Sequence, residues 1–177
     1  MALHGVSIAI PEPWGARLQG CREEVGDPLA QAVPPHITLM PPTDIPQEQL
    51  EPFRHHLQTV ALDHGPFTVH LRGTGTFRPV SPVVFVQVAQ GIPMCERLEH
   101  AVRSGPVSRD LEFPYHPHVT IAHGIEDVGL DRAFHEMADF EATFEVSQFH
   151  LYEHGGDGVW RPVFDLRLSG PRLDASR

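Results

Sequence analysis

The chain has 177 residues, a formal net charge of −10 at pH 7 and no lysine, which suits one domain and argues against a broad basic surface that grips long nucleic acid. It has no run of about 18 apolar residues and no signal-peptide pattern at its start, so we expect a cytoplasmic protein that does not engage a membrane. Cys21 and Cys95 are too few for a disulfide scaffold or a cysteine-rich zinc site.

The first half of the chain predicts the order strand, helix, strand, helix, strand. Residues 3–10 alternate as a strand, and a helix is expected over 14–26. Residues 35–39 form a short β-type stretch that ends before two prolines. An apolar stripe at helical spacing then runs over 50–61, and 67–71 alternate as a strand.

The second half repeats this order. An apolar strand is expected over 83–88, a helix over 94–102, a strand over 117–121 and a helix over 130–137. The repeat indicates a duplicated unit with its seam near residues 76–82.

Two more strands complete the chain, over 143–153 and 160–168, with a glycine-rich turn between them. Alternation in the last strand places Trp160 on the same face as Phe164, Leu166 and Leu168. Residues 171–177 are expected to form a frayed tail.

These elements predict the α+β class and one domain over residues 1–170, with sequence halves at 1–78 and 79–170. We expect a bilobal duplicated unit with two mainly antiparallel sheets, helices outside and a central cleft that carries the repeated motifs.

The repeated motifs are Pro-His-Ile-Thr-Leu at residues 35–39 and Pro-His-Val-Thr-Ile at 117–121. In a strand, alternate side chains share a face, so His36 and Thr38 lie together, as do His118 and Thr120. A single copy is most simply a buried strand whose histidine is satisfied by a carbonyl group. Two copies in one chain instead predict that both polar faces line one cleft.

A pair of imidazoles in a cleft can divide a proton-transfer reaction, because histidine titrates near neutral pH. One neutral ring takes a proton from water and one protonated ring gives a proton to the departing oxygen. The threonine hydroxyls and backbone amides can hold phosphate oxygens. This arrangement suits a cyclic phosphodiester, because attack and departure occur on opposite sides of phosphorus, and it requires no metal. Which histidine is acid and which is base stays open.

In both motifs and their spacing, the chain resembles the two-histidine (2H) phosphoesterase superfamily, and within it the bacterial 2'-5' RNA ligase-like proteins, also described as RNA 2',3'-cyclic phosphodiesterases. The resemblance covers residues 3–169. It implies a bilobal α+β fold with antiparallel sheets around a cleft. It also implies metal-independent and cofactor-free hydrolysis of a 2',3'-cyclic phosphate to a 2'-phosphate, in some members with reversible 2'-5' ligation.

The resemblance assigns catalysis to His36 and His118 and phosphate binding to Thr38 and Thr120. Many members carry arginine three residues after the second threonine, where this chain has His123. An imidazole makes a weaker and pH-dependent phosphate contact than a guanidinium group. His123 is therefore a candidate substrate contact, and its presence leaves the substrate open.

Other aromatic and basic residues near the motifs have competing interpretations. Phe113 and Tyr115 can stack on a base, or they can pack in the core. Arg78 can reach a phosphate or lie in a surface turn. A zinc site is an alternative use of histidines 116, 118 and 123, although no typical metal-binding spacing supports it.

We therefore expect a monomeric cyclic phosphodiesterase with no metal and no cofactor, whose partner is a nucleotide or an RNA end bearing a cyclic phosphate. One alternative is a non-catalytic module that binds a nucleotide or phosphometabolite on the same fold. Another is a metal-dependent hydrolase.

Overall fold

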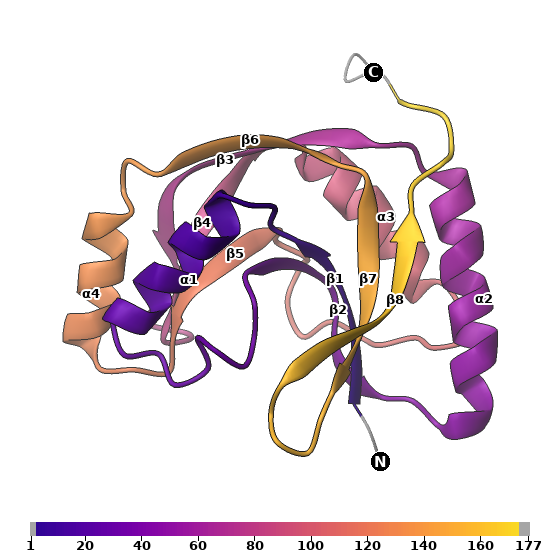
Figure 1. Ribbon diagram of the computed structural model, residues 1–177, viewed down its shortest axis with the longest axis horizontal. Coiled ribbons are helices and arrows are strands. Elements are labelled where there is room, and N and C mark those ends of the chain that lie inside the picture. Colours follow the sequence, from indigo (N-terminus) through magenta and orange to yellow (C-terminus); the bar gives the residue numbers. More distant parts are fainter. Residues whose placement is uncertain (1–2, 174–177) are drawn as a thin grey trace.

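Residues 3–173 are described by the computed structural model, and they form eight strands and four helices (Figure 1). The strands are β1 (Leu3–Ala9), β2 (His36–Asp44), β3 (Phe67–Thr76), β4 (Val83–Gln90), β5 (His118–His123), β6 (Glu141–Val146), β7 (Gln148–His154) and β8 (Trp160–Arg167). The helices are α1 (Trp14–Glu24), α2 (Gln47–Asp63), α3 (Ile92–Arg103) and α4 (Asp127–Glu136). The α+β class and the rest of the predicted order of elements are confirmed, but the single strand expected over 143–153 is wrong. The structure has two strands there, β6 beside β3 and β7 beside β1, because the chain passes from one half of the sheet to the other at residue 147.

The eight strands form a single curled antiparallel sheet in the order β6-β3-β4-β5-β2-β1-β7-β8. The prediction of two sheets is therefore wrong. Backbone pairing between Ile37 of β2 and Val119 of β5 joins two four-stranded halves into one sheet. This pairing links residues 82 positions apart, so local periodicity carries no sign of it.

Each half of the sheet contains strands from both halves of the sequence. β3 lies beside β4 in one half, and β7 lies beside β1 in the other. The helices also cross between the two halves. α1 comes from the first half of the sequence and packs on β5 of the second half, whereas α3 comes from the second half and packs on β2 of the first. The two repeated units are consequently interlocked in space, and the motif strands β2 and β5 lie side by side at the centre (Figure 1).

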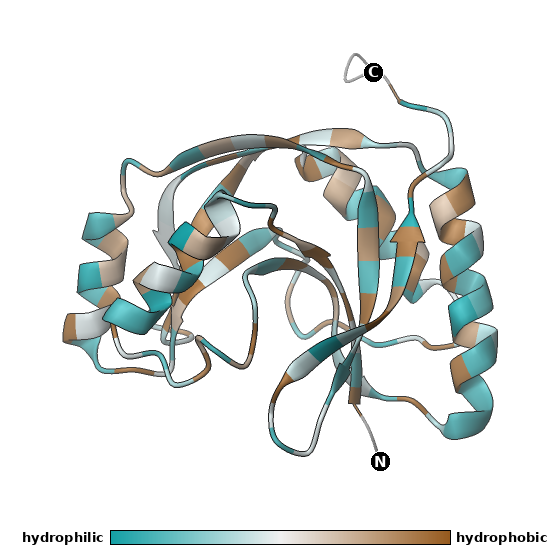
Figure 2. Ribbon diagram, viewed as in Figure 1, coloured by the Kyte–Doolittle hydropathy of each residue, from teal (hydrophilic) through white to brown (hydrophobic). Residues whose placement is uncertain are grey.

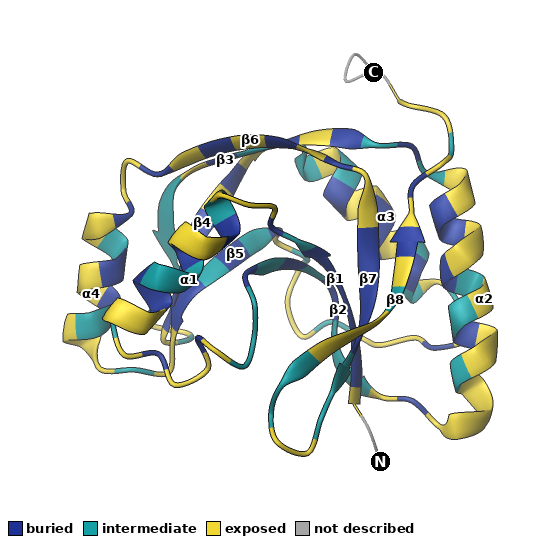
Figure 3. Cartoon of the chain, viewed as in Figure 1, coloured by how far each residue is buried: buried dark blue, intermediate teal, exposed yellow. Residues whose placement is uncertain are grey.

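The buried side chains of the helices pack against one face of the sheet, where the core forms (Figures 2 and 3). Phe53, Leu57, Val60 and Ala61 of α2 are buried at the spacing predicted from the sequence. Cys21 and Cys95 are buried free thiols, and burial raises their pKa values to about 11 and about 12. Protonated thiols of this kind serve as small core residues.

The last strand departs from the predicted alternation. Leu151 pairs with Phe164, but Tyr152 pairs with Pro162, so Val163 is an extra residue that forms a β-bulge. Because a bulge shifts the pleat by one residue, Trp160 lies on the face opposite to Phe164 and Leu166. The prediction that Trp160 packs with those residues is wrong.

Only part of the predicted tail is described. Of the predicted frayed tail 171–177, residues 174–177 lie outside the described part, and Arg172 forms an ion pair with Glu145 of β6. In residues 3–173, no helix has both the length and the apolar character to cross a bilayer.

Candidate active site

The pairing of Ile37 with Val119 sets the two motifs against each other. Continuing the antiparallel register places His36 opposite Thr120 and Thr38 opposite His118. Ile37 and Val119 are fully buried in the core, whereas the four polar side chains lie half-buried on the other face. Diagonal neighbours in such a pair are about 7–8 Å apart, so both imidazoles lie within reach of one phosphate group. The residues that the sequence singled out for catalysis and phosphate binding are thus brought together.

Each motif ends in a β-bulge directly after its threonine. Leu39 is the extra residue where β2 pairs with β1, and Ile121 is the extra residue where β5 pairs with β4. Because each bulge shifts the alternation by one residue, the residue three positions after the threonine points to the same face of the sheet as the motif histidine and threonine. That residue is Pro41 in the first motif and His123 in the second. His123 is exposed at the end of β5, on the side of Thr120.

Both motif histidines are held in the same tautomer. The Nδ1 atom of His36 lies 2.7 Å from the carbonyl oxygen of Pro34, and the Nδ1 atom of His118 lies 2.7 Å from that of His116. A carbonyl oxygen only accepts hydrogen bonds, so Nδ1 carries the proton in each ring. Nε2 is therefore the atom of each ring that can gain or lose a proton.

Burial favours the neutral form of both imidazoles. It lowers the pKa of His36 to about 4; the hydrogen bond to the Pro34 carbonyl opposes this shift, and the positive charges of Arg22 and of His118 add to it. Burial also lowers the pKa of His118, with a smaller contribution from the neighbouring His116 and an opposing one from the His116 carbonyl. Both rings are therefore neutral near pH 7 in the free protein.

Aromatic neighbours distinguish the two histidines. The His36 ring stacks on the indole of Trp160, with centroids 4.9 Å apart and an angle of 28° between the planes. The His118 ring instead meets Phe77 and Phe85, at centroid distances of 5.0 and 5.1 Å. The indole of Trp160 therefore covers one face of the His36 ring, whereas two phenylalanine rings pack against His118.

A cavity of about 630 Å³ opens beside His118 and Thr38. A volume of this order fits a small organic ligand. His36, Thr120 and His123 are not among its lining residues. The lining includes Phe77, Arg109, Phe113, Tyr115 and His116.

The two predicted stacking residues differ in their surroundings. Phe113 is 59% exposed and lines the cavity, so its ring is free to contact a ligand. Tyr115 packs against the core, and its hydroxyl donates a hydrogen bond of 2.8 Å to the carbonyl oxygen of Thr38. Burial raises the pKa of Tyr115, so this hydroxyl keeps its proton. Tyr115 ties the segment before β5 to the first motif strand.

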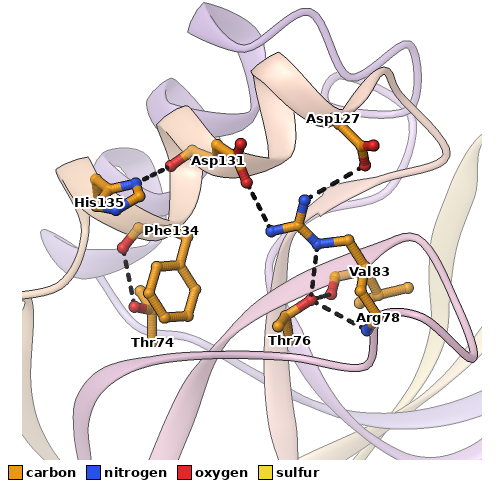
Figure 4. Close-up of polar contacts among 8 residues, drawn as sticks. All are labelled: Thr74, Thr76, Arg78, Val83, Asp127, Asp131, Phe134 and His135. Carbon is orange, nitrogen blue, oxygen red and sulfur yellow. Dashed lines mark hydrogen bonds and ion pairs between the residues drawn. The ribbon is translucent and has the colours of Figure 1, made fainter.

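Arg78 does not enter the cavity. Its guanidinium group bridges Asp131 at 2.9 Å and Asp127 at 3.3 Å, both on α4, and its Nε atom lies 3.3 Å from the Thr76 hydroxyl (Figure 4). It anchors the segment after β3 to α4, next to Phe77. The geometry supports the interpretation of Arg78 as a surface residue.

A buried ion pair shapes the segment that leads into β2. Arg22 of α1 is 3% exposed, and its Nε and Nη2 atoms each lie 3.0 Å from a carboxylate oxygen of Asp27. Its Nη1 atom donates to the carbonyl oxygen of Val33 at 2.9 Å. Val33 precedes Pro34, whose carbonyl holds His36, so Arg22 fixes the backbone that orients the first histidine.

Sequence reasoning did not assign Phe77, Phe85, Arg22 or Arg109 to the site, and it placed Trp160 on the same face as Phe164. None of these residues belongs to a recognisable motif.

The alternative zinc site has little geometric support. His116 and His118 lie at the start of β5 or just before it, whereas His123 lies at the other end of that strand. Across residues 3–173, no group of three histidine, cysteine or carboxylate side chains is placed to hold a metal ion.

Comparison with known proteins places this arrangement in context. The sequence model of the 2'-5' RNA ligase superfamily matches residues 10–158. Proteins named "Putative phosphoesterase" from Bacillus thuringiensis (strain Al Hakam) and Bacillus cereus (strain Q1) are each 35% identical over 146 residues, which is 80% of this chain and 83% of theirs.

Solved structures share the fold. TT0787 of Thermus thermophilus superposes with a TM-score of 0.66 at 22% identity, over 96% of this chain and 100% of that one. E. coli LigT complexed with 3'-AMP superposes with a TM-score of 0.67 at 18% identity, over 95% and 98% of the two chains. LigT has also been solved with NADP+ and with ATP.

Proposed function

The chain belongs to the 2'-5' RNA ligase superfamily, and we propose that it hydrolyses a 2',3'-cyclic phosphodiester on a nucleotide or an RNA terminus. His36 and His118 supply acid-base catalysis without a metal ion or cofactor. The observation that carries the proposal is the matched pair of imidazoles, each donating from Nδ1 to a carbonyl and each beside the other motif's threonine.

The asymmetry of the site supports one assignment of the two roles. The leaving oxygen stays on the ribose, so the acid lies on the side where the nucleoside is bound. The cavity beside His118 is the space for the nucleoside, which makes His118 the acid. Its pKa rises when a phosphate anion binds next to it, because an opposite charge favours the imidazolium form.

His36 acts as the base on the other side of phosphorus. Its pKa of about 4 keeps the ring neutral and able to accept a proton near pH 7. Water attacks phosphorus and gives its proton to Nε2 of His36, while the bond from phosphorus to one ribose oxygen breaks and that oxygen takes the proton from Nε2 of His118. The hydroxyls of Thr38 and Thr120 donate to phosphate oxygens as their charge grows.

The charge around the cavity favours a small substrate. Its lining includes the carboxylates of Asp110 and Glu112 against one arginine, Arg109. Each additional phosphodiester on a substrate would be repelled by these carboxylates. We therefore propose a cyclic mononucleotide or a short RNA end bound by a monomer. The nucleotide complexes of LigT support a nucleotide in this fold.

His123 in place of the usual arginine favours one alternative, a non-catalytic module that binds a nucleotide or phosphometabolite. A panel of cyclic phosphates separates the two: 2',3'-cyclic mononucleotides, RNA 3' ends bearing a cyclic phosphate and ADP-ribose cyclic phosphate, each assayed with EDTA present. We expect cyclic mononucleotides to be converted to the 2'-phosphate. Binding without turnover would favour the alternative, and loss of turnover in EDTA with recovery in zinc would indicate a metal-dependent hydrolase.

A further inference from the structure

Trp160 reaches the motif face of the sheet because β8 contains a bulge. Val163 is the extra residue, and on its far side Pro162 pairs with Tyr152 and Trp160 pairs with His154. Without the bulge, alternation would direct the indole into the core with Phe164. Bulges that redirect a side chain are enriched next to active sites.

The indole is held in place on several sides. The backbone N–H of Trp160 donates a hydrogen bond of 2.9 Å to the carbonyl oxygen of Ala32, in the segment that leads into β2. Its ring contacts Tyr152 and His154 at centroid distances of 5.8 and 5.9 Å. The ring also lies over Gly5, where an added Cβ would stand 3.6 Å from its outer edge. Trp160 is therefore a fixed wall of the site.

This wall stands on the His36 side only. His36 stacks on the indole at 4.9 Å, whereas His118 borders the cavity of about 630 Å³. In the proposed reaction, the nucleophile approaches phosphorus from the His36 side. The space available there decides which nucleophile can enter.

We infer that Trp160 is a specificity-determining residue that restricts the nucleophile to water. This inference rests on the proposed function and on His36 as its base. An alcohol acceptor, such as the 5'-hydroxyl of a nucleoside, would form the same bond to phosphorus, lose its proton to Nε2 of His36 and release the same ribose oxygen. On this inference the indole stacked on His36 limits the space for the body of such an acceptor, so the product is a free phosphomonoester and not a 2'-5' phosphodiester joined to a second nucleoside.

The test measures how the product divides between hydrolysis and transfer. A 2',3'-cyclic mononucleotide is incubated with glycerol or with adenosine as acceptor, and the monoester and diester products are quantified by ³¹P NMR. The wild type is expected to give only hydrolysis. The Trp160→Ala variant is expected to raise the ratio of transfer to hydrolysis by about tenfold or more, the range that the size of a binding pocket can control.

Two control variants isolate the size of the side chain at this position. Trp160→Phe keeps a ring against His36 and should retain most of the preference for water. Trp14→Ala removes an indole from α1, which packs against Phe144 away from the motifs, and should leave the product ratio unchanged. If Trp160→Ala does not fold, Trp160→Leu provides the smaller side chain, with folding checked by its melting temperature.

The outcomes separate this inference from the proposed function. A product ratio that rises in Trp160→Ala or Trp160→Leu, but not in the two controls, supports the inference. Wild-type hydrolysis with an unchanged ratio in a folded small-residue variant overturns the inference and leaves the proposed function intact. Absence of hydrolysis in the wild type for every cyclic phosphate overturns both.

Discussion

Ile37 pairs with Val119 across the middle of the sheet, and this contact turns two distant copies of one motif into a single site. Each histidine consequently lies next to the threonine of the other copy. The bulges that follow both threonines repeat the same backbone geometry on the two sides. The duplicated sequence thus gives two histidines with nearly the same backbone geometry. Their surroundings differ, because His36 stacks on Trp160 and His118 borders the cavity.

The first prediction concerns the dependence of kcat/KM on pH. His36 must be neutral to act as a base, so activity rises with pH through its pKa of about 4. His118 must be protonated to act as an acid, and its pKa in the free protein lies below the usual value of 6.5. Activity therefore falls as the pH rises through that lowered value, and kcat/KM is bell-shaped with an acidic maximum.

The pH profile of kcat should extend to higher pH than that of kcat/KM. Bound phosphate raises the pKa of His118, so the alkaline limb of kcat moves to higher pH. Initial rates with a cyclic mononucleotide between pH 3.5 and pH 9, at low and at saturating substrate, measure both profiles. A kcat/KM that keeps rising between pH 7 and pH 9 would contradict the assignment.

A second prediction separates ligand stacking from structural support in the cavity. Phe113→Ala should raise KM for a cyclic purine nucleotide by about tenfold, because stacking on an aromatic ring is worth about 1–3 kcal/mol per base. Because Phe113 is 59% exposed, its removal should leave the melting temperature nearly unchanged. Val128→Ala, at an exposed apolar residue of α4, is the matched control. An unchanged KM in Phe113→Ala would show that the base does not lie on this ring.

A third prediction concerns the ion pair beneath the first motif. Arg22→Met should lower the free energy of unfolding by about 3–5 kcal/mol, because Asp27 is left as an uncompensated buried charge. The double variant Arg22→Met with Asp27→Leu should lose less, since both charges are removed together. Arg161→Met, which breaks an exposed ion pair with Asp157, should have little effect.

Chemical denaturation monitored by circular dichroism measures all four proteins. If the double variant is at least as unstable as Arg22→Met, the hydrogen bonds of this pair to the backbone, from Arg22 to the Val33 carbonyl and from the Leu29 N–H to Asp27, outweigh the balance of charge.

Much of the fold could be predicted because it depends on local pattern. The helical stripe of α2 and the alternation around His36 and His118 are set by neighbouring residues, and the duplicated order of elements made one shared cleft the natural expectation. The single sheet could not be predicted, because it depends on the pairing of β2 with β5, which no local pattern encodes. Trp160 was placed on the wrong face, because strict alternation leaves no room for a bulge at Val163.

Within the candidate site, the four motif residues could be named from the sequence because their types and spacing repeat. The supporting residues could not. Arg22 acts through a backbone carbonyl next to the motif, and Phe77 meets His118 from the turn between β3 and β4, which is distant in sequence. Stacking on a base and packing in the core were both open for Tyr115 in the sequence, whereas the structure packs its ring against the core and shows its hydroxyl bound to the carbonyl of Thr38.

The most direct measurement is the turnover of a 2',3'-cyclic mononucleotide in the presence of EDTA by the wild type, His36→Asn and His118→Asn. Asparagine can still donate a hydrogen bond from the position of Nδ1, but it lacks Nε2, and His70→Asn, at a histidine paired with Glu141 on the edge of the sheet, is the control. We predict metal-independent turnover by the wild type and by the control, and a loss of about 10²–10⁴-fold in each motif variant. Turnover at the wild-type rate by either motif variant would contradict the account.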